Sequence, residues 1–202
     1  MKPSPEKTLV LELGPDWIPG VSRFFQRGVL VEARLGSSVR AFLLDQLGLS
    51  AGYLEARIQT IILNGKVVDD PAAAAIHPGA VLCLSAAMPG LLGATLRTGS
   101  YYAAMRSQIS WKGGAPSSGG EKGTVVLKLF NLLINEMGPR LLHRGVRVPA
   151  EDLASLLVEQ TAWLRDRGAK AFVDGSIVDL ERLPGAAWGN RLIFLKLRCP
   201  HR

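Results

Sequence analysis

Cationic and aromatic residues alternate in one segment of this sequence, which has no acidic residue between Leu91 and Gly120. Because arginine and lysine contact phosphates while aromatic rings stack on bases, such a segment can bind single-stranded nucleic acid. The same residue types are also the usual anchors of protein–protein interfaces. A structural arm that packs Tyr101, Tyr102 and Met105 against a sheet is the third alternative. The candidate partner-binding residues are Arg97, Tyr101, Tyr102, Arg106, Trp111 and Lys112.

Residue patterns typical of catalysis or metal binding are missing from the sequence. His77, His143 and His201 are far apart and do not show the spacing of metal ligands. Cys83 lies in an apolar run, where a small core residue is expected, and Cys199 with His201 offers only two ligands near a chain end. Neither a phosphate-binding glycine loop nor a Gly-x-Ser-x-Gly nucleophile motif occurs. We therefore expect no catalytic residue, no metal site and no cofactor.

The 202-residue chain has a net charge of +7, and this charge is unevenly distributed. Residues 1–90 hold eight basic and eight acidic residues, whereas residues 91–202 hold sixteen and nine. A polyanionic partner is therefore expected on the second half. Two cysteines favour a reducing compartment. The polar N-terminus does not resemble a secretory signal, and prolines and glycines interrupt the apolar stretch 80–96. We expect a soluble cytoplasmic protein.

The elements that must position these residues begin with five predicted strands and one helix. Val39, Phe42, Leu43 and Leu47 fall at helical spacing after Ser37 and Ser38, which are candidate caps. Asn64-Gly65 is a strong signal for a two-residue hairpin. The expected strands are 8–13, 29–35, 57–63, 66–68 and 80–85, with the last one central in the sheet because it is apolar throughout.

This order of strand, strand, helix, strand, short return and strand requires one sheet with one helix packed across it. The residues resemble the ubiquitin-like β-grasp family, and most closely the sulfur carriers of molybdopterin and thiamine biosynthesis. The likeness depends on Ile62-Leu63-Asn64-Gly65-Lys66-Val67-Val68 and on His77-Pro78-Gly79-Ala80-Val81-Leu82-Cys83-Leu84. It covers about residues 8–93.

The small RNA-binding domain of ribosomal protein S4 is a rival, because it also contains Asn-Gly-Lys-Val followed by a Pro-Gly turn. That domain needs a helix just before the strand that carries Asn-Gly. Residues 52–56 leave hardly one turn for such a helix, so the sequence favours the β-grasp interpretation.

The resemblance implies a chemistry that this chain lacks as written. Sulfur carriers end in Gly-Gly, and their terminal carboxylate is adenylated and then converted to a thiocarboxylate. The carrier-like tail here contains Pro89, Gly90 and Gly93 without a Gly-Gly pair, and 109 residues follow Gly93. Only proteolysis that exposed Gly114 or Gly120 would produce a carrier, and we favour linker glycines instead.

The C-terminal part is expected to contain two helices and three strands. Leu127, Phe130, Ile134, Met137 and Leu141 recur at helical spacing, and a second helix is predicted over 150–167. Strands 171–173 and 176–178 flank Asp174-Gly175, a final strand spans 192–197, and we detect no internal repeat. Helices followed by a hairpin also permit a winged-helix DNA-binding interpretation, which the four acidic residues on the second helix disfavour.

These observations together predict an α+β protein in three parts. An N-terminal ubiquitin-like β-grasp domain (1–93) precedes a basic aromatic arm with a Gly/Ser linker (94–123), and a smaller helical and β-hairpin domain (124–202) follows. The predicted function is that of a non-enzymatic adaptor or accessory subunit. Its partner is expected to be a larger protein, such as a cofactor-dependent enzyme, with nucleic acid bound through Arg97–Lys112 as the alternative and a processed sulfur carrier as the third hypothesis.

Overall fold

The computed structural model describes residues 6–14, 18–88, 90–106, 108–117, 120–188 and 192–200. The chain forms two compact units whose bounds are not the expected ones at residues 93 and 123. The internal unit is Leu30–Asn135, and the terminal unit is built from both chain ends, Met1–Val29 and Glu136–Arg202. Each unit combines strands and helices, in agreement with the expected mixed α and β class.

The strands of the internal unit lie in the order β4-β3-β5-β6-β2. Parallel pairing of β5 with β6 places Leu82 beside Leu127 and Leu84 beside Leu129, and all four side chains are fully buried. The β5 strand is therefore central, as its apolar sequence predicts. The bounds are β2 Val29–Arg34, β3 Thr60–Leu63, β4 Lys66–Val67, β5 Val81–Ser85 and β6 Lys122–Phe130.

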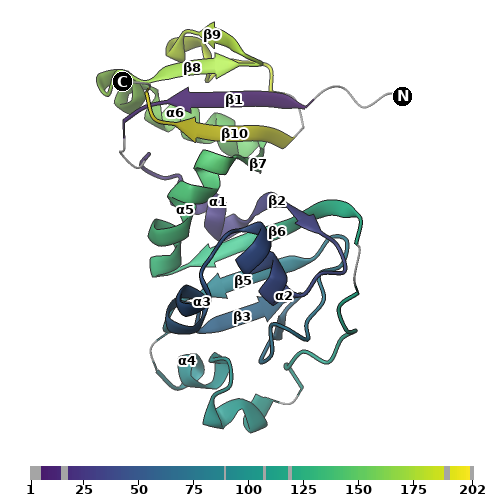
Figure 1. Ribbon diagram of the computed structural model, residues 1–202. Coiled ribbons are helices and arrows are strands. Elements are labelled where there is room, and N and C mark those ends of the chain that lie inside the picture. Colours follow the sequence, from purple (N-terminus) through teal and green to yellow (C-terminus); the bar gives the residue numbers. More distant parts are fainter. Residues whose placement is uncertain are drawn as a thin grey trace. The chain divides into compact units, whose positions relative to one another are not determined.

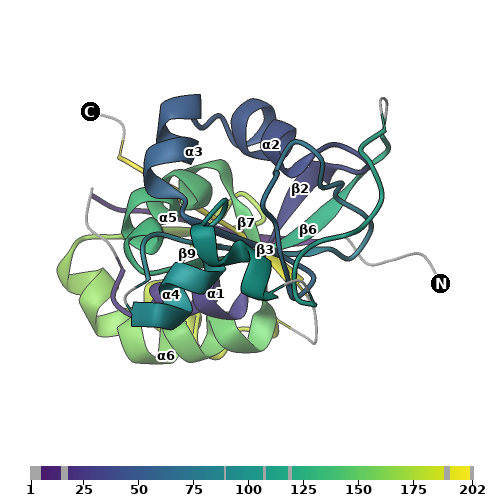
Figure 2. The same cartoon turned by 90° about the horizontal axis from the view of Figure 1, so that it is seen from below.

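Two capped helical segments cover one face of this sheet (Figures 1 and 2). The first is α2 (Val39–Ala41), which continues as the π-helical turn η1 (Phe42–Gln46), and the Ser38 hydroxyl accepts a hydrogen bond from the amide of Ala41. The second is α3 (Ala51–Arg57), which Ser50 caps in the same way. Because both serines satisfy otherwise unpaired amides, they fix where the two segments begin.

The α3 helix corrects the expectation of hardly one helical turn before the Asn-Gly strand. It extends to Arg57, so β3 begins at Thr60 and not at residue 57. The length of the helix before the Asn-Gly strand therefore does not disfavour the ribosomal RNA-binding domain, contrary to our expectation. The helix nevertheless has only one basic residue, Arg57, and carries the acidic Glu55.

The strands of the terminal unit lie in the order β7-β10-β1-β8-β9, with both parallel and antiparallel pairs. The α6 helix lies against these strands (Figure 1) and buries Leu153, Leu156, Leu157 and Leu164, which is the stripe predicted from sequence. The bounds are β1 Lys7–Glu12, α1 Ser22–Arg27, β7 Val146–Pro149, α6 Ala150–Asp166, β8 Lys170–Val173, β9 Ser176–Val178, η3 Leu180–Arg182 and β10 Leu192–Arg198. Both predicted hairpins are confirmed, with positive φ at Asn64, Gly65, Asp174 and Gly175.

The first predicted strand does not pair with the other strands of the expected β-grasp domain. The β1 strand instead pairs in parallel with β10 and antiparallel with β8. The expected place of β1 in the internal sheet, beside β5, is occupied by β6. This strand begins after residues 86–120, which connect β5 to β6. Both β1 and β6 have the apolar residues that an inner strand needs. The apolar pattern alone therefore does not determine which of them pairs with β5.

The predicted helix that started at Leu127 is wrong over its first residues, 127–131. Residues 122–130 form β6, in which Val125, Leu127 and Leu129 are buried at alternate positions. The helix α5 (Leu132–Arg144) begins only after Asn131, whose positive φ ends the strand. The apolar spacing of +3 and +4 that predicted one helix therefore combines residues of the β6 strand with residues of the α5 helix.

An internal repeat, which the sequence did not reveal to us, is visible in the order of elements. The first half runs β1, α1, β2, helix, β3, β4, β5, and the second runs β6, α5, β7, α6, β8, β9, β10. The junction before the second strand is Arg-Gly-Val in both, with Gly28 at φ 118 and Gly145 at φ 99. The hairpin turn is Asn-Gly in one repeat and Asp-Gly in the other.

The two repeats exchange their first strands. The β1 strand of the first repeat completes the terminal sheet, and β6 of the second repeat completes the internal sheet. In both sheets the exchanged strand is parallel to the last strand of the other repeat. The two positions are not equivalent, because the strand that begins each hairpin adjoins β5 in the internal sheet and adjoins β1 in the terminal sheet.

Candidate functional site

The predicted arm belongs to a segment between β5 and β6 that we call the insert, residues 86–120. It contains α4 (Gly90–Leu96) and the 3-10 helix η2 (Tyr101–Arg106), and it belongs to the internal unit (Figure 1). The insert has no aspartate or glutamate. Its sequence-predicted residues fall into two groups, one buried against the sheet and one presented to solvent.

The buried group is centred on Arg106, whose side chain makes a two-pronged ion pair with Asp69. Nη2 donates to Oδ1 at 2.6 Å and Nη1 donates to Oδ2 at 2.9 Å. The remaining guanidinium hydrogens go to the carbonyls of Thr95 and Arg97 and to the Ser110 hydroxyl. Arg106 is only 4% exposed, so this pair fastens the insert to the loop after β4.

Hydrogen bonds from Arg106 also hold the pKa of the Asp69 carboxyl below its ordinary value, against the opposing effect of burial. The amide of Gly99 adds a further bond to Oδ1 at 3.0 Å. Asp69 is therefore ionised wherever the fold is stable near neutral pH. The charge of Arg106, which we expected among the partner contacts, is neutralised inside the protein instead.

Trp111 is likewise held by the sheet. Its amide donates to the carbonyl of Val67 at 2.7 Å, and the amide of Val67 donates to the carbonyl of Ile109 at 2.8 Å. These bonds place Ser110 beside Val67 as a parallel extension of the β4 edge. The insert thus covers an edge that would otherwise be open to pairing. Trp111 is partly buried, whereas the side chain of Lys112 is exposed.

The exposed group consists of aromatic and aliphatic side chains on the helical part of the insert. Tyr101 is 93% exposed, Tyr102 is 38% exposed, and their rings meet edge to face at 5.5 Å. Leu91 is 70% exposed. The alternative of a structural arm with both tyrosines packed against the sheet does not hold for Tyr101, since a ring packed in that way would be shielded from solvent.

A hollow of about 430 Å³ lies beside these tyrosines, and we call it the tyrosine hollow. It unites both of our sequence-predicted groups, because Gly90 and Gly93 of the carrier-like tail line it together with Arg97, Tyr101 and Tyr102. Pro89 lies outside the described residues. The remaining lining residues are Met88, Ala94, Gly99 and Ser100.

Two details show how this hollow is built. Gly93 is required by close packing, because a Cβ there would lie 2.0 Å from the carbonyl oxygen of Met88. The Ser100 hydroxyl is shielded from solvent and has no hydrogen-bond partner among the described residues. A buried hydroxyl without a partner costs free energy, which a ligand or partner group in the hollow could recover.

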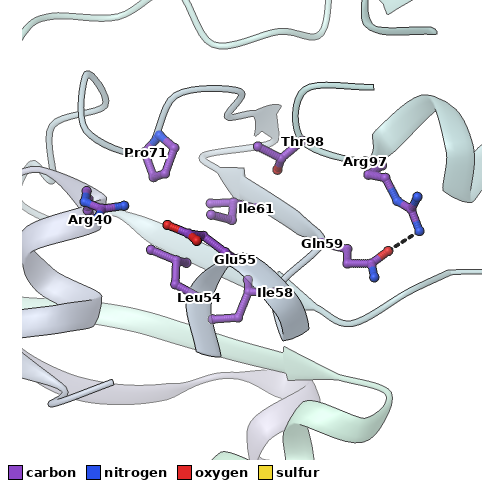
Figure 3. Close-up of a pocket in the computed structure, with 9 residues that line it drawn as sticks. All are labelled: Arg40, Leu54, Glu55, Ile58, Gln59, Ile61, Pro71, Arg97 and Thr98. Carbon is purple, nitrogen blue, oxygen red and sulfur yellow. Dashed lines mark hydrogen bonds between the residues drawn. The ribbon is translucent and has the colours of Figure 1, made fainter. Parts of the chain in front are cut away.

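A second hollow of about 400 Å³ shares Arg97 with the first, and we call it the arginine pocket (Figure 3). The sequence did not predict it, because its residues come from α2, α3, β3 and three loops with no recognisable spacing. Its floor is apolar, and charged side chains stand at both ends. The lining residues are Arg40, Leu54, Glu55, Ile58, Gln59, Ile61, Pro71, Arg97 and Thr98.

None of the histidines and cysteines in the described ranges lines either hollow. Burial raises the pKa of the Cys83 thiol, with Lys128 opposing the shift, so Cys83 is a poor nucleophile near neutral pH. His143 places Nδ1 3.1 Å from the carbonyl oxygen of Leu197. His201 lies outside the described residues, within which no three His, Cys, Asp or Glu side chains gather as metal ligands would.

Two of the four acidic residues of α6 have partners in α1. Arg23 pairs with Glu159 at 2.8 Å, and Arg27 pairs with Asp152. The bond from Arg23 lowers the pKa of Glu159. These pairs leave α6 as a structural helix of the terminal unit, which gives the winged-helix interpretation no support.

Comparisons with protein families, with curated proteins and with solved structures found no match to this chain. Across the described ranges, no helix combines the length and the apolar character that crossing a bilayer requires.

Proposed function

We propose that this protein is a non-enzymatic adaptor or accessory subunit that binds a larger protein through the tyrosine hollow. The observation that carries the proposal is the 93% exposure of Tyr101 on a segment whose neighbouring side chain, Arg106, is locked by a buried ion pair. Tyrosine is among the residues that contribute most to protein interfaces. A rigid support reduces the entropy that is lost when such a side chain is immobilised by a partner.

We further propose that the internal unit is a ubiquitin-like β-grasp sheet whose first strand is β6. With β6 counted first, the unit has the expected order of strand, strand, helix, strand, short return and strand. The carrier likeness would then indicate the kind of partner, an enzyme that handles a cofactor. In this proposal Gly90 and Gly93 belong to a helix that lines the binding surface and are not a reactive tail.

Protein is a better candidate than nucleic acid as the partner. Binding to a polyanion strengthens with each cation that contacts a phosphate. Of the three cations in the insert, Arg106 is neutralised by Asp69, so Arg97 and Lys112 are the two whose charge remains for phosphates. Single-stranded RNA and DNA, titrated at low salt, are therefore expected to bind weakly and without dependence on Arg106.

The test is a comparison of two exposed apolar positions. A partner that copurifies with the native protein is identified, purified and titrated against the wild type, Tyr101→Ala and Ile177→Ala. Ile177 is the matched control because it is 69% exposed but lies in the terminal unit. Loss of an interface tyrosine costs about 2 kcal/mol, or roughly thirtyfold in Kd.

The proposal requires that Tyr101→Ala raise the Kd for the partner, while Ile177→Ala leaves it at the wild-type value. Equal affinities for wild type and Tyr101→Ala would contradict the assigned surface. A native preparation that contains only the monomeric chain would contradict the adaptor function itself. Tight binding of single-stranded nucleic acid with a steep salt dependence would favour a nucleic-acid-binding function instead of the adaptor function.

A further inference from the structure

The arginine pocket has a preformed apolar floor. Leu54, Ile58 and Ile61 touch the pocket while their remaining surface is packed in the core, at 4%, 4% and 1% exposure. Figure 3 shows them between α3 and β3, with Pro71 and Thr98 on the opposite wall. Because these apolar side chains are fixed by packing, the floor does not have to form when a ligand binds.

Backbone hydrogen bonds hold the walls of the pocket in place. The amide of Thr98 donates to the carbonyl of Gln59 at 2.9 Å, and the amide of Arg40 donates to the carbonyl of Pro71 at 2.8 Å. These bonds connect the insert to the start of β3 and α2 to the loop after β4. The volume of about 400 Å³ lies within the range of small-molecule sites, roughly 300–1,000 Å³.

The two ends of the pocket differ in charge. At one end, Figure 3 shows the Glu55 carboxylate directed toward Arg40, so an acid there opposes the positive charge. At the other end, Arg97 Nη2 donates to the Gln59 Oε1 atom, which is neutral. The positive charge of Arg97 is therefore not cancelled by this contact, and the Gln59 amide still has its NH₂ group as a donor.

We propose that the arginine pocket binds a small amphipathic carboxylate. Its carboxylate would accept hydrogen bonds from Arg97 and from the Gln59 NH₂ group, because guanidinium groups match the geometry of carboxylates. Its apolar body would cover Leu54, Ile58 and Ile61. This proposal is independent of the proposed adaptor function, since it makes no use of Tyr101.

Phenylbutyrate is a suitable probe, because it joins an apolar body to one carboxylate by a flexible chain. Calorimetric titration of the full chain compares it with phenylbutyramide and phenylbutylamine, which have the same body with a neutral or a cationic end. We expect the acid to bind about tenfold or more tightly than the amide, and the amine not to bind. Equal binding of the acid and the amide, or no binding of the acid, would overturn the proposal.

Three variants locate the bound carboxylate. Arg97→Gln removes the cation, and Gln59→Glu supplies an internal carboxylate that pairs with Arg97 and repels the ligand. Each is expected to weaken phenylbutyrate binding about tenfold or more, whereas the exposed Arg182→Gln in the terminal unit keeps the wild-type affinity. Thermal melting shows that each variant is folded. Wild-type affinity in both pocket variants would place the carboxylate elsewhere, and Tyr101→Ala should have no effect.

Discussion

Arg106 illustrates how far residue type alone predicts a role. The alternation of Arg, Tyr and Trp indicated a binding segment, and this hypothesis treated all its cations as equivalent. Only the fold distinguishes them, because the partner of Arg106 is Asp69, 37 positions earlier, in a loop after a different strand. An acidic residue at that separation gives no sequence signal, so the ion pair could not be predicted. Tyr101 stays a candidate contact, because its side chain is 93% exposed although its ring meets that of Tyr102.

The Asp69–Arg106 pair yields a prediction on stability and its pH dependence. Replacement of Asp69 by Asn leaves a buried guanidinium without its charged acceptor and should lower the free energy of unfolding by about 2 kcal/mol near neutral pH. The pKa of Asp69 is lower in the folded state, so its contribution is complete above the unfolded-state value. The contribution is lost as the pH falls through the folded-state value, which lies below the ordinary pKa of an aspartate.

Urea unfolding of wild type and Asp69→Asn at several pH values measures this difference. Asp70→Asn is the matched control, since the Asp70 carboxylate accepts a bond from the amide of Ala72, which an asparagine oxygen can also do. The wild-type advantage over Asp69→Asn should shrink in acid, while Asp70→Asn behaves as wild type throughout. A difference that does not change with pH would show that the carboxylate charge is unimportant.

At the scale of elements, the glycine that ends α5 has a role that a similar glycine after α6 lacks. Gly145 has a φ of +99, and a Cβ on it would lie 2.0 Å from the ring of Phe194 in β10. Gly168 also has a positive φ, of +63, but its Cβ would meet no atom within 4 Å. Gly145→Ala should therefore lower stability by about 3 kcal/mol, and Gly168→Ala by about 1 kcal/mol.

Thermal and urea unfolding of the two variants checks this comparison. Equal losses would mean that the ring of Phe194 moves aside without cost, and that only the backbone conformation matters. The result also bears on the repeat, because Gly28 occupies the corresponding junction of the first half with a φ of 118.

Elements with strong local signals were predicted well from the sequence, and those that depend on distant partners were not. The hairpins at Asn64-Gly65 and Asp174-Gly175 and the helix α6 have turn residues, caps and spacing within a few positions. The end of the β6 strand was read as a helix because two of its apolar residues, Leu127 and Phe130, also fit a helical spacing that continues across Asn131. Pairing between strands more than a hundred residues apart, such as β1 with β10, leaves no local pattern.

The candidate site shows the same difference between features that have a local sequence signal and features that depend on distant residues. The lack of acidic residues and the aromatic content of residues 94–123 led us to predict an arm and linker between two domains, whereas this segment belongs to the internal unit. The arginine pocket was missed, because Arg40, Gln59 and Arg97 come together only when α2, β3 and the insert are folded. We had also expected linker glycines at Gly120, yet a Cβ there would collide with the carbonyl of Leu35.

At the scale of the whole molecule, the exchanged first strands make the two repeats depend on each other. The β6 strand lies between β5 and β2, and β1 lies between β10 and β8, so each is an inner strand of its sheet. A fragment of residues 1–117 lacks β6, and a fragment of residues 120–202 lacks β1. Without an inner strand the remaining strands cannot pair, so neither fragment is expected to fold alone.

Separate expression of the two fragments, followed by mixing, tests this dependence through circular dichroism and size-exclusion chromatography. We expect unfolded or aggregated fragments that regain native secondary structure when combined, because mixing restores β6 to one sheet and β1 to the other. Residues 30–135 provide the control: this fragment is shorter than 1–117 but contains the internal sheet with β6, and it should fold alone. A folded 1–117 would mean that β1 replaces β6 beside β5. The exchange would then be one of two arrangements of similar free energy, and the unexchanged repeat would be an independent domain.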